Sequence, residues 1–185
     1  LGCEVTETYT VQEPEVLEID VVGTIDILCN GAETGIATVT STGGCAPYFY
    51  NWSHDANLNT PVATGLGAGV FTVTVNDVNG CASAGSVTIT LTQPGDPIDV
   101  IVNSVTTYAG GYNVSCPDAS DGGVDITITG GTPGYFVSWV NNETQETFFL
   151  EDLVNAPCGN YTLTVVDSND CTFTTDIELT CVPDW

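Results

Sequence analysis

Eight cysteines are the residues of this 185-residue chain best suited to chemistry. Their number is even, none lies in a Cys-x-x-Cys motif, and a single histidine accompanies them, so a zinc site explains them poorly. Disulfide formation in an oxidising, extracytoplasmic compartment explains them better. The candidates are Cys3, Cys29, Cys45, Cys81, Cys116, Cys158, Cys171 and Cys181.

Ser53-His54-Asp55 contains the three residue types of a hydrolytic triad, but in consecutive positions. Adjacent side chains cannot relay a proton in line, because a triad is assembled from separated segments. The chain also contains no phosphate-binding glycine loop and no Gly-x-Ser-x-Gly motif. We therefore expect no enzymatic activity, and we expect His54 to lie in an exposed loop.

Short acidic and amide side chains cluster in three segments that resemble turns. Ca²⁺ prefers six to eight oxygen ligands, so these segments are candidate calcium sites, although none matches an EF-hand loop. The alternative is that Asp and Asn shape tight turns there, and it is the interpretation that we favour. No cofactor other than calcium is expected. The residues are Asp77, Asn79, Asp118, Asp121, Asp167, Asn169 and Asp170.

The formal net charge of −24 arises because the chain contains no Lys or Arg, and not because acidic residues are unusually frequent. Nucleic-acid binding is excluded, since that affinity depends on Lys and Arg. Binding to anionic membrane surfaces is excluded for the same reason. No apolar segment approaches the length of a membrane span, so membrane insertion is not expected.

A pattern of cysteine, glycine and aromatic residues occurs twice with equal spacings. The interval from the first Cys to Gly-Gly is 14 positions, and the interval from Gly-Gly to Trp is 9. The interval from the later single glycine, Gly69 or Gly159, to the second Cys is 12. A repeat of this length indicates one supersecondary unit used more than once. The copies are Cys29, Gly43-Gly44, Trp52, Gly69 and Cys81, then Cys116, Gly130-Gly131, Trp139, Gly159 and Cys171.

Segments that alternate apolar residues with threonine predict half-buried strands, and helical periodicity is missing. Each repeat contains about seven such segments, with a tryptophan in the third, which is typical of an immunoglobulin (Ig)-like fold. A type I′ hairpin is predicted at Asn79-Gly80. The expected architecture is all-β, with tandem Ig-like antiparallel β-sandwiches. Residues 1–14 would be the terminal strand of a preceding repeat or a donated strand, 15–94 the first repeat and 95–185 the second, with proline-stiffened linkers.

The repeats resemble the SprB-type repeats, related to PKD-like domains, of giant surface adhesins in gliding bacteria. The features that carry the resemblance are the first cysteine, Gly-Gly with its following Pro and Tyr, the tryptophan, the Gly-x-Phe/Tyr-Thr-Val/Leu-Thr-Val strand, Asp77-Val-Asn79-Gly80-Cys81 and Gln93-Pro94. The second repeat departs from this pattern at Asp170 and at Val182-Pro183. The resemblance implies an extracellular adhesin or filament array, exported by the type IX pathway, without catalytic role.

The Ig-like topology favours two disulfides. The turn after the sixth strand lies near the connection between the second and third strands, which places Cys81 near Cys45. Cys158 precedes the sixth strand at the opposite end, and Cys181 occupies the inward-facing position that Leu91 holds in the first repeat. Cys45–Cys81 and Cys158–Cys181 are therefore the favoured pairs, although sequence alone does not determine connectivity.

The family pattern suggests a different pairing, between the two motif cysteines of each repeat: Cys29–Cys81 and Cys116–Cys171. The Ig-like topology places these partners at opposite ends of one sandwich, too far apart for a bond. In a head-to-tail array, Cys29–Cys171 could instead connect consecutive repeats. Both alternatives stay open at the level of sequence, and Cys3 has no assigned partner.

Aromatic residues suggest a binding surface. Tyr48, Tyr50 and Trp52 alternate onto one face, but the tryptophan occupies the position of the Ig core aromatic, which argues against a sugar site. Outward-facing phenylalanines are better candidates for an apolar patch that meets another chain or repeat. These residues are Phe49, Phe136, Phe148 and Phe149.

We therefore expect an extracellular, structural or adhesive tandem-repeat protein, a section of a cell-surface adhesin or extracellular filament. Its expected partners are other repeats or identical subunits, and possible further partners are surface glycans. One alternative is a filament subunit in which residues 2–14 are donated to a neighbouring chain by β-augmentation. Another alternative is a carbohydrate-binding accessory module of a secreted enzyme.

Overall fold

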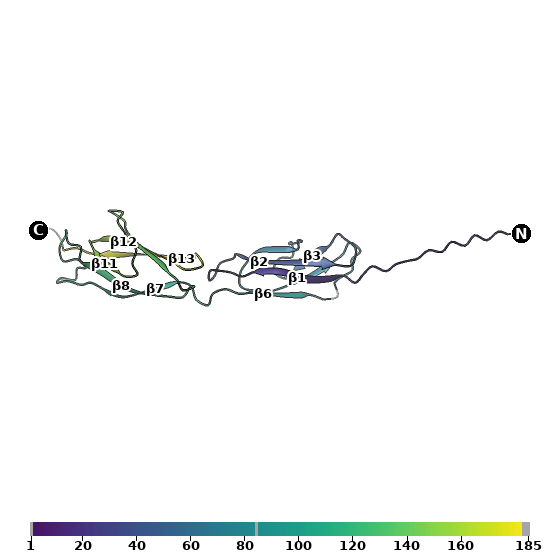
Figure 1. The fold of residues 1–185 in the computed structure, drawn as a ribbon, viewed down its shortest axis with the longest axis horizontal. Helices are drawn as coiled ribbons and strands as arrows, with labels where there is room; N and C mark the ends of the chain where they lie inside the picture. Colours follow the sequence, from purple (N-terminus) through teal and green to yellow (C-terminus); the bar gives the residue numbers. More distant parts are fainter. Residues whose placement is uncertain (1, 84, 183–185) are drawn as a thin grey trace. The chain divides into compact units, whose positions relative to one another are not determined.

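The computed structural model describes residues 2–83 and 85–182, which form β-strands and no helix. The chain folds into two compact units, shown in Figure 1. Unit 1 comprises Leu1–Asp26 and Glu33–Thr92, and unit 2 comprises Ile27–Ala32 and Gln93–Trp185. The division differs from the sequence repeats: the segment Ile27–Ala32 and Gln93-Pro94, from the first repeat, belong to unit 2, and residues 2–14 are grouped with unit 1.

Unit 1 is built from two antiparallel three-stranded sheets, ordered β1-β2-β4 and β3-β5-β6. This order corresponds to the A-B-E and C-F-G sheets of an Ig-like sandwich, which confirms the predicted fold class. The strands are β1 (Glu18–Ile25), β2 (Gly35–Thr42), β3 (Phe49–Trp52), β4 (Val62–Leu66), β5 (Gly69–Asn76) and β6 (Val87–Leu91).

Unit 2 repeats the arrangement with sheets ordered β11-β8-β7 and β10-β9-β12-β13. The short strand β10 adds an edge to the second sheet and has no counterpart in unit 1. The strands are β7 (Asp99–Val105), β8 (Gly122–Thr129), β9 (Phe136–Asn141), β10 (Thr147–Phe148), β11 (Leu153–Ala156), β12 (Gly159–Val166) and β13 (Thr172–Leu179).

Alternation along the strands creates the two cores. In β12, Tyr161, Leu163 and Val165 are fully buried, whereas the intervening threonines are only half-buried. Trp139 is also fully buried in unit 2, and Trp52 is 3% exposed in unit 1. Each indole N–H donates to a backbone carbonyl, of Thr60 in unit 1 and of Leu150 and Glu151 in unit 2. The tryptophans are therefore core residues.

Residues 2–14 form no strand in this structure, and their side chains are exposed. Val5, Tyr9 and Val11 are 87%, 79% and 93% exposed, although their spacing alternates as in a strand. The first strand of unit 1 begins at Glu18.

The predicted type I′ turn at Asn79-Gly80 is wrong. Only Gly80 has a positive φ, of 80°, and the corresponding residue of unit 2 is Asp170, with a φ of 63°. Gly80 donates its N–H to the Asp77 carbonyl at 3.0 Å, which closes a type I turn followed by a left-handed residue. The Asp77 side chain selects this turn, because its carboxylate accepts the Asn79 N–H at 2.9 Å.

The described residues contain no long apolar helix of the kind that spans a membrane.

Candidate functional site

The hairpin between β12 and β13 is organised around the buried carboxylate of Asp167. One carboxylate oxygen accepts the N–H groups of Asn169 and Cys171, at 2.8 and 2.9 Å. The other accepts the N–H of Thr132 at 2.8 Å, from the segment that follows β8. Asp167 is only 4% exposed, so this single side chain fixes the hairpin and joins it to the neighbouring loop.

Unit 1 repeats this arrangement around Asp77, which is 3% exposed. Asn79 and Cys81 donate to one oxygen, both at 2.9 Å, and Cys45 donates to the other at 3.1 Å. From the sequence, Asp77 and Asp167 are expected only as turn formers or calcium ligands. Their role as backbone acceptors could have been inferred from the Asp-x-Asn-x-Cys spacing that both repeats share.

The two carboxylates are held in the ionised state. Burial raises the pKa of Asp167, but the hydrogen bonds from Thr132, Cys171 and Asn169 outweigh it and lower the pKa below its ordinary value. Burial likewise raises the pKa of Asp77, and the hydrogen bonds from Cys81, Cys45 and Asn79 lower it further than burial raises it. These carboxylates are therefore structural anchors at neutral pH.

The Gly-Gly motif of each repeat makes room for these carboxylates. Gly131 has a φ of 61°, and a Cβ atom there would lie 2.8 Å from the nearer Asp167 oxygen. The preceding Gly130 has a φ of 69° and approaches the Pro97 carbonyl too closely for any side chain. Glycine is required at both positions, for backbone conformation and for space.

Cys171, which the Asp167 carboxylate anchors, forms a disulfide with Cys29, with a Cα–Cα distance of 5.6 Å. The two residues are 142 positions apart, so the bond joins the first sequence repeat to the second. Both residues lie in unit 2, because Cys29 is part of the segment Ile27–Ala32. Of the two arrangements considered for Cys29 and Cys171, the structure contains the one that connects the repeats.

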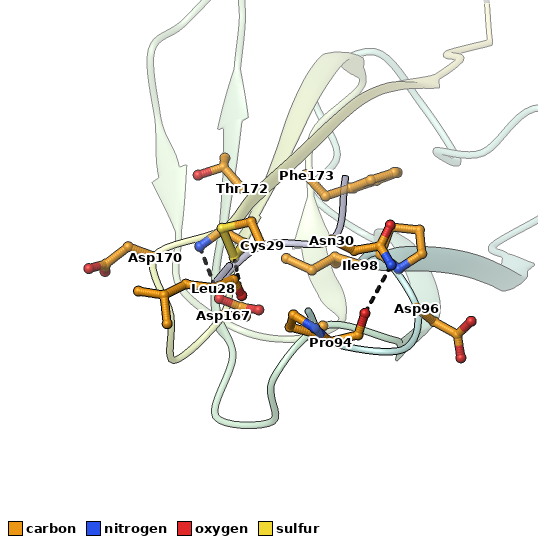
Figure 2. A pocket seen from close by; sticks show the side chains of 13 residues that line it. Leu28, Cys29, Asn30, Pro94, Asp96, Ile98, Asp167, Asp170, Thr172 and Phe173 are labelled. Atoms are coloured by element: carbon orange, nitrogen blue, oxygen red, sulfur yellow. Dashed lines mark hydrogen bonds between the residues drawn. A yellow bond between two sulfur atoms is a disulfide. The ribbon is translucent and has the colours of Figure 1, made fainter. Parts of the chain in front are cut away.

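Hydrogen bonds hold the Cys29 segment in unit 2 (Figure 2). The Asn30 side-chain amide donates to the carbonyls of Pro94 and Gly95, at 3.0 and 3.1 Å. Gly31 donates its N–H to the Gln93 side chain at 2.9 Å, and Asn169 donates to the Leu28 carbonyl at 3.1 Å. The segment is thus fixed by polar contacts on both sides of the disulfide.

A cavity of about 390 Å³ adjoins this disulfide, and Figure 2 shows the residues that line it. Its lining combines apolar groups such as Ile98 and Phe173 with the acidic residues Asp96 and Asp170. No lining residue supplies a positive charge, because the chain contains no Lys or Arg. An anionic ligand would therefore find no charge complement there.

Cys158 and Cys181 form the second disulfide, with a Cα–Cα distance of 5.5 Å, as the topology predicted. It joins the start of β12 to the end of β13, within unit 2. The structure thus contains two disulfides, which are typical of proteins that fold in oxidising compartments.

The predicted disulfide between Cys45 and Cys81 is wrong, because both residues are free thiols in the structure. The prediction placed them correctly beside one another. They are joined through Asp77, since each donates its backbone N–H to that carboxylate. A carboxylate, not a disulfide, connects the two segments.

The pairs that the family pattern suggested, Cys29–Cys81 and Cys116–Cys171, are also wrong. Cys116 follows Val114, which pairs with Cys181 beyond the end of β13, whereas Cys171 precedes the start of β13. An eight-residue strand spans about 27 Å, so these cysteines are far beyond disulfide distance. Cys116 and Cys3 are exposed free thiols.

Most candidate calcium ligands are engaged by the protein itself. Asp121 accepts the Ser115 N–H at 3.0 Å and the Ser115 hydroxyl at 2.6 Å, and Asp77 and Asp167 accept the amides described above. Asn169 donates to Leu28 and Thr132, whereas Asp118 and Asp170 are exposed. Within residues 2–83 and 85–182, no group of three or more His, Cys, Asp or Glu is arranged to hold a metal ion.

His54 lies on the unit 1 surface between two aromatic rings. Its ring packs edge-on against Trp52 and Phe71, with centroid distances of 5.8 and 5.2 Å. Ser53 accepts the Thr72 N–H, and Asp55 accepts the Asn57 N–H. The Ser53 and Asp55 side chains therefore satisfy local backbone groups.

The candidate phenylalanines divide into two groups. Phe49, Phe136 and Phe149 are 42%, 57% and 63% exposed, and the Phe136 and Phe149 rings pack 5.7 Å apart beside a cavity of about 350 Å³. Phe148 instead packs against the core of unit 2, with its ring 6.2 Å from Tyr161. The exposed apolar patch of unit 2 therefore contains Phe136 and Phe149 but not Phe148.

The SprB repeat family model matches this sequence at residues 24–57 and 112–144. Each match spans the first cysteine, Gly-Gly and the tryptophan of one repeat. Two regions of the chain, one in each sequence repeat, therefore match the SprB repeat model. The matches cover less than half of the chain, and the hairpin cysteines Cys81 and Cys171 lie outside them.

A search of curated proteins returned no significant match to this chain. Among solved structures, similarity was found to a C-terminal fragment of intimin, crystallised with the intimin-binding domain of the translocated intimin receptor. The identity is 17% and the TM-score 0.46, and the match covers 88% of this chain and 63% of the fragment.

Two further matches are Ig-domain structures. The eight N-terminal Ig domains of Down syndrome cell adhesion molecule match at 12% identity and a TM-score of 0.40, over 91% of this chain and 25% of that one. The two Ig domains of DIP-gamma match at 11% identity and a TM-score of 0.36, over 90% and 99%. Since TM-scores below 0.5 carry little structural information, the fold assignment of the two units depends on the strand pairing described above.

Proposed function

We propose that this chain is a load-bearing section of an extracellular adhesin built from tandem SprB-type repeats. The observation that supports this proposal is the Cys29–Cys171 disulfide, which covalently joins consecutive repeats in addition to the polypeptide linker. The resemblance stated above adds a cell-surface location in gliding bacteria and export by the type IX pathway. Catalysis has no part in the proposal.

The disulfide changes the path that a pulling force takes through the chain. Force applied at the two ends passes from the N-terminal residues to Cys29, crosses the sulfur–sulfur bond to Cys171, and continues to the C-terminal residues. The 142 positions between the two cysteines are thereby removed from the load. Strands β2 to β12 lie within this closed loop and carry no load while the bond is intact, whereas β1 and β13 remain in the load path.

This arrangement suits an adhesin more than an enzyme accessory module. An adhesin must transmit force from its contact surface to the cell without lengthening, whereas a carbohydrate-binding module carries no sustained tension. Tandem repeats also allow many weak contacts to act together, since linked sites bind at high effective concentration. The exposed Phe136 and Phe149 are candidates for such contacts.

Single-molecule force spectroscopy tests the proposal. With the chain tethered at both ends, treatment with a thiol reductant should increase the unfolded contour length by about 50 nm, because 142 residues of about 3.3–3.6 Å each enter the load path. The Cys29→Ser variant should show most of this increase without reductant. Equal extension of the oxidised and reduced wild-type chain would refute the proposal.

The Cys158→Ala, Cys181→Ala double variant is the matched control. It removes a disulfide that closes a loop of only 23 positions and leaves the Cys29–Cys171 bond in place. Its oxidised contour length should stay close to that of the wild type. The comparison separates force shielding from a general loss of stability.

A second candidate is a filament subunit, and the exposed N-terminal segment favours it. Val5, Tyr9 and Val11 follow Cys3 at the same intervals at which Phe173, Ile177 and Leu179 follow Cys171. In β13 these positions face the core, whereas in the N-terminal segment they are exposed. Strand donation to a neighbouring chain would bury them. Deletion of residues 2–14 should then abolish assembly, and assembly that persists would exclude this candidate.

A further inference from the structure

Four cysteines are free thiols in the structure, and two of them occupy the same places as the bonded pair. Cys81 holds the hairpin position in the first repeat that Cys171 holds in the second. Cys116 holds the loop position in the second repeat that Cys29 holds in the first. The chain therefore carries one completed loop-to-hairpin disulfide, and Cys81 and Cys116 provide one further copy of each half within the folded units.

The hairpin half is already organised. The Asp77 carboxylate accepts the Cys81 N–H at 2.9 Å, and the Asp167 carboxylate accepts the Cys171 N–H at the same distance. Asn79 is the counterpart in sequence of Asn169, which donates to the carbonyl preceding Cys29. Cys81 is exposed, so its thiol is accessible to a second chain.

The loop half is organised as well. Cys29 follows the buried Ile27, and Cys116 follows the buried Val114 at the same interval. The carboxylate of Asp121 accepts both the N–H and the hydroxyl of Ser115, which fixes the backbone immediately before Cys116. The Cys116 side chain is exposed beyond this fixed point.

We propose that Cys116 of one copy of this chain forms a disulfide with Cys81 of a second copy, with the loop-to-hairpin geometry of Cys29–Cys171. The oxidant is a small disulfide such as oxidised glutathione. The Cys81 thiolate attacks it and releases one glutathione thiolate. The Cys116 thiolate then attacks the mixed disulfide and releases the second, so that two protein thiols are oxidised and one small disulfide is reduced.

The inference is independent of the proposed adhesive role, because it depends only on the correspondence of the repeats. It also differs from strand donation, since it needs no residue before Asp77. One contact of the existing bond is not reproduced: Pro117 stands where Asn30 donates two hydrogen bonds, so the loop docks through fewer polar contacts. Covalent capture is therefore expected to be slower than closure of Cys29–Cys171.

Complementary single variants provide the test. Cys81→Ser retains only the loop half and Cys116→Ser only the hairpin half, so neither can form the proposed bond alone. In a glutathione redox buffer, an equimolar mixture should give a covalent dimer on a non-reducing gel. The wild type should give a ladder of dimers and larger species, and each variant alone should stay monomeric.

Peptide mapping identifies the bond. Trypsin is unsuitable because the chain contains no Lys or Arg, but cleavage before aspartate isolates Cys81 in residues 77–95 and Cys116 in residues 99–117. A linked pair of these two peptides in the mixed dimer supports the proposal. A dimer linked through Cys3 or Cys45, a Cys45–Cys81 bond within one chain, equal dimer formation by either variant alone, or no dimer would each overturn it.

Discussion

The backbone N–H of Cys171 donates to the Asp167 carboxylate at 2.9 Å, so the cysteine that bonds to Cys29 is positioned from within its own hairpin. The carboxylate is buried and accepts two further amides, which leaves the hairpin little freedom. Pre-organisation of this kind lowers the entropic cost of forming the disulfide. The repeat motif therefore supplies both the bonding cysteine and the aspartate that positions it.

Replacing Asp167 with Asn should destabilise the protein. An amide offers one acceptor oxygen, and its NH₂ group would face the Thr132 N–H or the Asn169 and Cys171 N–H groups. We expect Tm to fall by roughly 5–10 °C, since buried donors lose their partners. Asp170→Asn is the matched control: Asp170 is exposed, and Asn tolerates its positive φ. A similar loss of Tm in both variants would contradict the assignment.

The stability difference between the wild type and the Asp167→Asn variant should depend on pH. The folded-state pKa of Asp167 is lowered, so the unfolded chain takes up the proton at a higher pH than the folded one. The stabilisation is complete above the ordinary Asp pKa of about 3.9 and is lost as the pH falls through the lowered value. The Tm difference between wild type and Asp167→Asn should therefore be constant near neutral pH and shrink below about pH 4. A difference that grows on acidification would contradict this sign.

Calcium and magnesium should raise Tm equally. All 24 acidic side chains repel one another without any Lys or Arg to compensate, so either divalent cation stabilises by screening. The buried carboxylates of Asp77 and Asp167 are occupied by amide donors and offer no specific site. Thermal melts at equal CaCl₂ and MgCl₂ concentrations check this expectation. An additional increase with calcium would support a calcium site among the candidate ligands.

Two adjacent phenylalanines should respond differently to substitution. Phe148→Ser removes a ring that packs on the unit 2 core near Tyr161, and we expect it to lower the free energy of unfolding by about 1–3 kcal/mol. Phe149→Ser changes a ring that is 63% exposed, and its effect should stay within about 0.5 kcal/mol. Chemical denaturation measures both. Equal losses would place Phe149 in the core as well.

Local pattern was sufficient to predict the strands. Alternating apolar residues and threonine define one buried face, as in β12, and the tryptophan at equal spacing in both repeats identifies the shared core. The Cys158–Cys181 pair also followed from topology, because both residues lie at one end of adjacent strands. Such features depend on short-range periodicity, which sequence expresses directly.

The sequence by itself determined an all-β tandem repeat that is rich in cysteine and contains no Lys or Arg. Only the tertiary structure decided how the cysteines are used, because disulfide formation requires two Cα atoms within about 7 Å and spacing along the chain does not report that distance. Cys45 and Cys81 lie beside one another but are joined only through the Asp77 carboxylate. Cys29 and Cys171, which are 142 positions apart in the sequence, form a disulfide. That proximity arises because Ile27–Ala32 separates from its own repeat and packs with the next.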